Sequence, residues 1–150
     1  MTARADYTDA EWAALRRAPV LAGVSIGLAD PGGPLESEDD LMATVRAVAE
    51  TPAGEGELAG AVARDVRNLA EHRRSPVAEL SLAPRTAELE IRDQLARVNA
   101  ILAAKATPGE AAAFKRWVLD AARRAAGGRV SDAERRALDS VADLLAVPQA

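Results

Sequence analysis

Apolar side chains recur every three or four residues along most of the chain, as in the run Leu58, Val62, Val66 and Leu69. This spacing places them on one face of an α-helix. A half-buried strand would instead alternate apolar and polar residues, and no stretch sustains that alternation. The pattern predicts six helices, at roughly 9–29, 37–50, 57–72, 86–104, 108–126 and 132–146. We therefore expect an all-α fold that packs as a helical bundle.

Polar residues mark where these helices begin. In a capping box, a hydroxyl accepts a hydrogen bond from a first-turn backbone N–H, and a glutamate three positions later accepts one from the N–H of the capping residue. The required pair precedes three predicted helices, at Thr8 with Glu11, Thr107 with Glu110, and Ser131 with Glu134, and a weaker version begins at Ser37. Proline and glycine separate the helices, at Pro31–Pro34, Pro52–Gly54, Ser75–Pro76, Pro84 and Gly127–Gly128.

The first predicted helix carries no charge over the twelve residues from Ala18 to Ala29. Twelve helical residues extend only about 18 Å, which is too short to cross a bilayer, so we expect a central buried helix. Pro19 removes one backbone hydrogen bond and is expected to kink this helix or split it near Arg17. Gly23 and Gly27 have no side chains and would let another helix approach closely.

The segment 75–86 is the best candidate for a connection between two halves, which would span about 8–74 and 86–147. Each half alone would be near the size at which a single hydrophobic core becomes marginal. We therefore expect one domain over residues 1–150, in which the two halves pack on a shared core.

The two ends of the chain contain similar connections between helices. Near the start, a helix with a small-residue end leads through paired glycines to Leu35 and an acidic helix start. Near the end, the same order runs through paired glycines to Val130. Glycine permits the backbone conformation that ends a helix, and the aliphatic residue can fill the core as the next helix begins. The shared order predicts a degenerate duplication, with two related helix-loop-helix units in one bundle.

At these residues the chain resembles the TerB-like family, helical proteins associated with tellurite resistance and with phage or stress defence. In that family, a helix ending in small residues meets Asp-Gly, then a hydrophobic residue, and then a glutamate four positions later in the next helix. The unit occurs twice. The resemblance covers most of the chain and implies a helical protein of the same kind.

The resemblance also implies roles for individual residues, which differ between the two units. In the first unit the correspondences are Asp30 with the loop aspartate, Gly32 or Gly33 with its glycine, Leu35 with the hydrophobic residue and Asp39 with the helix acid. The Pro31–Pro34 loop is longer than the family spacing. In the second unit Gly128, Val130 and Glu134 fit, whereas Gly127 replaces the loop aspartate. Acids in these loops are proposed to bind divalent cations in the family, so the second unit lacks one ligand.

Five carboxylates lie between residues 30 and 40, and no basic residue lies between Arg17 and Arg46. Carboxylate oxygens are the ligands that Ca²⁺ and Mg²⁺ prefer, although acids also stabilise the first turn of a helix through its dipole. The EF-hand ligand order is absent, so two segments would have to supply any site. The candidate ligands for a weak Ca²⁺ or Mg²⁺ site are Asp30, Glu36, Asp39 and Glu134.

The chain contains no cysteine and one histidine, His72. Within one chain this excludes disulfides, thiolate catalysis, cysteine-bound zinc and metal sites with two histidines. The sequence also contains no phosphate-binding loop, dinucleotide fingerprint or nucleophile elbow, so we do not expect an enzyme. His72 falls at a predicted helix end, where a structural role is expected. The aromatic residues Trp12, Phe114 and Trp117 are expected to anchor the core.

Charge and composition limit the classes of partner and the cellular location that we expect. The formal net charge is −4, and acids interleave the arginines, so nucleic-acid binding is not expected. Arginine greatly outnumbers lysine, which is typical of a GC-rich bacterial genome. No apolar segment follows the first basic residue, so we expect no secretory signal and a cytoplasmic location.

Two functions of different classes are consistent with these features. The first is a non-catalytic, stress-associated interaction module that binds a protein partner through its helix faces. The second is a divalent-cation-binding helical domain that uses the acidic segment 30–40. The pattern of residues assigns neither the partner nor an oligomeric state.

A titration with Ca²⁺ and Mg²⁺ distinguishes these two functions. A cation bound to the native state raises the melting temperature, and it shifts or broadens the backbone NMR signals of residues 30–40. The interaction module predicts no change in melting temperature. Unchanged signals at millimolar Ca²⁺ would rule out the cation site.

Overall fold

The computed structural model describes residues 7–29, 38–53, 56–72, 84–125 and 132–145. These residues form six α-helices: α1 (Asp9–Ala29), α2 (Glu38–Glu50), α3 (Glu57–Glu71), α4 (Pro84–Lys105), α5 (Pro108–Ala125) and α6 (Asp132–Leu144). The all-α prediction is confirmed, and each helix begins and ends within two residues of its predicted position. No helix in the described ranges has both the length and the apolar composition needed to cross a membrane.

Two predictions about proline need correction. Pro84 is the first residue of α4 and does not lie between elements, because the first helical position needs no N–H donor and suits the fixed backbone angle of proline. Of the two effects expected of Pro19, a kink or a split, the split does not occur, because α1 continues from Asp9 to Ala29. The helix loses one backbone hydrogen bond there, but Pro19 is buried among helices that hold α1 on both sides.

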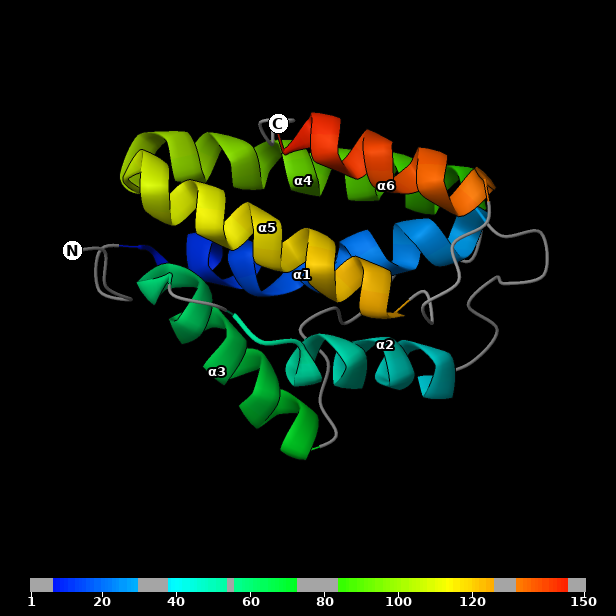
Figure 1. Cartoon of the computed structure of the whole chain (residues 1–150), viewed down its shortest axis with the longest axis horizontal. Helices are drawn as coiled ribbons and strands as arrows, with labels where there is room; N and C mark the ends of the chain where they lie inside the picture. The colour runs from blue at the N-terminus through cyan, green and yellow to red at the C-terminus, as the bar shows by residue number, and fades with distance from the viewer. Residues whose placement is uncertain (1–6, 30–37, 54–55, 73–83, 126–131, 146–150) are drawn as a thin grey trace.

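Helix α1 lies in the middle of the bundle and contacts each of the other five helices. In Figure 1, α4 and α6 follow one side of α1, α2 and α3 lie on the other side, and α5 crosses it. Its contacts with α4 and α5 are the most extensive. The predicted central position of the first helix is therefore confirmed.

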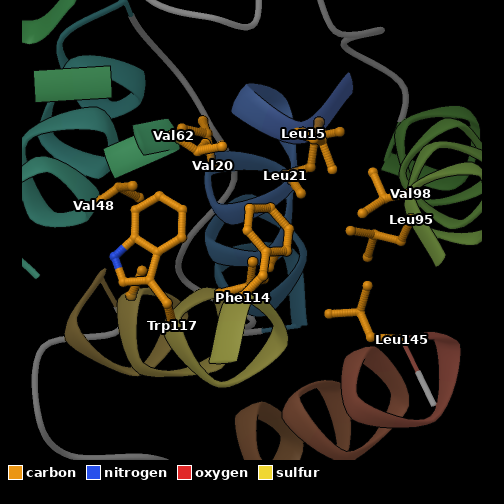
Figure 2. Close-up of a cluster of buried hydrophobic side chains, with 14 of the residues drawn as sticks. Leu15, Val20, Leu21, Val48, Val62, Leu95, Val98, Phe114, Trp117 and Leu145 are labelled. Atoms are coloured by element: carbon orange, nitrogen blue, oxygen red, sulfur yellow. The ribbon is translucent and has the colours of Figure 1, made fainter. Parts of the chain in front are cut away.

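The hydrophobic core is one cluster of buried side chains to which all six helices contribute. Figure 2 shows Phe114 and Trp117 of α5 beside Val20 and Leu21 of α1, with side chains of the other helices around them. Trp12, Phe114 and Trp117 are all buried, so their predicted role as core anchors is confirmed. Burying one such large side chain stabilises the fold by about 1.5–3 kcal/mol.

Small residues on α1 let its neighbours come close. Ala14, Ala18 and Ala22 are fully buried, and Gly23 lies where α2 and α5 approach. A Cβ atom at Gly23 would be 2.9 Å from Cγ2 of Thr44 and 3.2 Å from Cβ of Ala125, closer than ordinary van der Waals contact. The prediction that Gly23 permits close helix packing is confirmed. The surroundings of Gly27 lie outside the described part of the structure.

The N-terminal end of α1 is held by the predicted capping box. The Thr8 N–H donates to Oε1 of Glu11 at 2.8 Å, and the Glu11 N–H donates to Oγ1 of Thr8 at 3.1 Å. Nζ of Lys105, at the end of α4, donates to the same Oε1 of Glu11 at 2.6 Å. It also lies 5.8 Å from the centre of the Tyr7 ring. The capping glutamate thus links the first turn of α1 to the last turn of α4.

The Lys105 ammonium and the Thr8 N–H hold the pKa of Glu11 below its ordinary value of 4.5. A carboxyl group with a lowered folded-state pKa contributes stability above its unfolded pKa, and this contribution is lost as the pH falls through the folded value. Lys105→Met should therefore raise the Glu11 pKa toward 4.5 and move acid unfolding to higher pH. Carboxyl NMR of Glu11 measures the pKa directly.

The matched control is Arg64→Met, which removes an exposed positive charge from α3 without touching Glu11. The Glu11 pKa should stay unchanged in that variant. An unchanged Glu11 pKa in Lys105→Met would show that the ion pair does not form in solution.

Candidate functional site

A cleft of about 700 Å³ opens where the connection between α2 and α3 meets the first half of α5. One wall comes from residues between α2 and α3 and from the first residue of α3, and the other wall comes from α5 and the residue before it, over positions 107–120. The cleft is lined by Pro52, Ala53, Gly56, Glu57, Thr107, Gly109, Glu110, Ala113, Arg116, Trp117 and Asp120.

Side chains of α5 fix the wall of the cleft that is formed by the residues after α2. Nε1 of Trp117 donates to the carbonyl of Thr51 at 3.2 Å, and Nη1 of Arg124 donates to the carbonyl of Glu50 at 3.0 Å. The hydroxyl of Thr51 donates back to the carbonyl of Ala47 at 2.7 Å. These bonds satisfy carbonyls that the end of a helix leaves without partners. The position of Pro52 and Ala53 is therefore tied to α5.

Close contact with α5 fixes the start of α3. Gly56, the N-cap residue, has extended backbone angles (φ −73°, ψ 128°) and makes no side-chain cap bond. A Cβ atom at Gly56 would be 2.7 Å from Cβ of Ala113, so this approach requires glycine. Across the cleft, Oγ1 of Thr107 accepts from the Glu110 N–H at 3.2 Å, which is one of the two hydrogen bonds of the predicted capping box. The first turns of α3 and α5 thus both face the cleft.

Carboxylates outnumber cations around the cleft. Glu57 and Asp120 are exposed, Glu110 is half-buried, and among the described residues of the lining Arg116 is the one basic side chain. The two helix N-termini add partial positive charge inside the cleft. The opening is therefore acidic on balance, and such a surface favours a partner with basic side chains at its edge.

The predicted cation ligands are mostly outside the described residues. Asp30 and Glu36 belong to the undescribed range 30–37, and Asp39 lies in α2 in a turn whose side chains are not described. Glu134 lies in the first turn of α6 and is 8% exposed. Within the described ranges, no three acidic or histidine side chains are grouped to hold a metal ion. The cation site therefore stays a prediction.

Other predicted positions can be compared directly. His72 is the C-cap of α3, and its Nδ1 lies 2.8 Å from the carbonyl of Asn68, which confirms its place at a helix end. Trp12 is buried as expected, but its Nε1 also donates to Oδ2 of Asp65 at 2.6 Å, linking α1 to α3. This bond joins residues 53 positions apart and had no signal in the sequence.

The cleft was not predicted from the sequence either. Two local features of the sequence lie in its lining. Gly56 and Gly109 leave the starts of two helices without side chains, and Pro52 follows the end of α2. Those features look like ordinary helix boundaries until the neighbouring helices are known.

Comparison of the chain with models of protein families, with curated proteins and with solved structures found no match. The function must therefore be inferred from the geometry of the chain itself.

Proposed function

We propose that the protein is a non-catalytic interaction module whose protein partner docks in the cleft between α3 and α5. The observation that carries this proposal is the cleft of about 700 Å³, whose walls are tied to each other by the contacts of Trp117 and Gly56. A concave site with fixed walls loses little conformational entropy when it binds a partner, because its walls are already ordered.

The proposed partner is a protein segment with basic side chains. Glu57 and Asp120 lie on the two walls of the cleft and would contact lysine or arginine at its edge, while Pro52, Ala53 and Ala113 offer apolar surface between them. Opposite charges at the rim mainly raise the association rate and select the partner, and apolar contact supplies much of the affinity.

The TerB-like resemblance supports the same class of function. In the bundle, α2 and α6 each pack against both α1 and α5, as two copies of one helix-loop-helix unit would. Membership in that family remains part of this proposal, together with a stress-associated role.

Site-specific photocrosslinking tests the cleft. A benzophenone side chain at Gly109, where added atoms meet open space, should crosslink a defined partner in the cells that make the protein. Reversing the rim charges with Glu57→Lys and Asp120→Lys should lower the yield about tenfold, the change produced by about 1.4 kcal/mol. Both side chains are exposed, so the melting temperature should fall only slightly, through the loss of the first-turn acid Glu57 of α3.

The control places the same photoreactive side chain at Ala43, an exposed position of α2 that does not line the cleft. This variant should not capture the same partner. Equal crosslinking yields from positions 109 and 43 would contradict docking in the cleft. So would a crosslinking yield at position 109 that is the same with and without the two charge reversals.

A further inference from the structure

Helices α2 and α3 form a pair that packs on one side of the bundle. Each contacts the other more extensively than it contacts α1 or α5, and neither makes extensive contact with α4 or α6 in the described ranges. In Figure 1, α4 and α6 lie on one side, α1 and α5 lie in the middle, and α2 and α3 lie on the other side. The α2–α3 pair, described over 38–53 and 56–72, is therefore an outer layer drawn from one stretch of the sequence.

The other four helices do not need this pair in order to contact one another. Each of α1, α4, α5 and α6 contacts the other three directly. Buried side chains from all four helices belong to the core, among them Leu15, Leu95, Phe114 and Val141. A four-helix bundle with an apolar interior would thus remain if α2 and α3 moved away.

The order of the helices along the chain distinguishes the two outer layers. Helices α2 and α3 are consecutive, so they can leave the bundle together. Helices α4 and α6 are separated in the sequence by α5, which belongs to the middle of the bundle, and only two residues join α4 to α5. The layer of α4 and α6 therefore cannot move as one piece without also moving α5.

Indole N–H groups attach the α2–α3 pair to the middle of the bundle. The chain has two tryptophans, and each donates a hydrogen bond to the pair. Nε1 of Trp12 on α1 donates to Oδ2 of Asp65 at 2.6 Å, and Nε1 of Trp117 on α5 donates to the carbonyl of Thr51 at 3.2 Å. Both bonds cross the same boundary, so they break together if the pair moves away as a unit.

We propose that the α2–α3 pair opens away from α1 and α5 as one unit while the other four helices stay folded. Helices of 13 and 15 residues are marginally stable alone in water, so the detached pair loses its helical structure in this minor state. Opening also removes the cleft, because Gly56 and Glu57 leave with the pair while Ala113 and Trp117 stay on α5. The opening equilibrium thus controls whether the cleft exists, whatever binds there.

Native-state hydrogen exchange, followed by NMR, tests this opening. The protected amides of α2 and α3 should share one free energy of opening, as judged at Val45, Val48, Val62 and Val66. They should exchange at least about tenfold faster than the slowest amides of α1, α4 and α5, because the pair opens without global unfolding.

Val141→Ala in α6 separates local opening from global unfolding. It leaves a cavity among helices that stay packed when the pair opens, so it destabilises the closed and the opened states equally. Exchange from α2 and α3 should therefore stay unchanged, while the slowest amides of α1, α4 and α5 exchange about tenfold faster. Ile101→Val in α4 is a milder form of the same test, with a smaller acceleration expected.

Asp65→Ala is the matched change within the pair. It removes the acceptor for Trp12, so the closed state alone loses a bond, and exchange from α2 and α3 should become about tenfold faster. One opening free energy shared by the protected amides of all six helices in the unmodified chain would overturn the proposal. So would an acceleration of α2 and α3 exchange by Val141→Ala that equals the acceleration of the slowest amides.

Discussion

The close packing of α1 against five neighbours is the constraint on which the rest of the structure depends. A helix surrounded in this way must be narrow and largely apolar. Alanine and glycine along α1 make it narrow, and Gly23 lies where both α2 and α5 would collide with a side chain. Charged residues of α1 are confined to its first half, where Glu11 bonds to Lys105 of α4.

Helix α5 links the packing around α1 to the candidate site. Phe114 buries its ring in the core beside α1, and on the same helix Trp117 and Arg124 hold the chain that follows α2. The cleft exists because α5 is fixed on both sides, by the core and by these carbonyl contacts. A change that moves α5 relative to α1 would therefore reshape the cleft as well.

Much of the fold could be predicted from the sequence because its signals are local. Periodic apolar residues and the capping pair of Thr8 and Glu11 act within a few residues, so they located the helices. The bond from Trp12 to Asp65 and the cleft depend on which helices become neighbours, and no local pattern encodes that choice. Proline also acts through its surroundings, since burial lets α1 run through Pro19.

A pair of matched substitutions measures the central constraint. Gly23→Val adds a side chain where Thr44 and Ala125 already touch the helix, and Gly60→Val adds the same atoms to α3, where a Cβ meets nothing within 4 Å. In denaturant unfolding, Gly23→Val should lower the free energy of unfolding by about 1–3 kcal/mol, as overpacking does. Gly60→Val should change it by no more than about 0.5 kcal/mol. Equal stabilities for the two variants would contradict the close packing of α1 as the constraint that holds the bundle together.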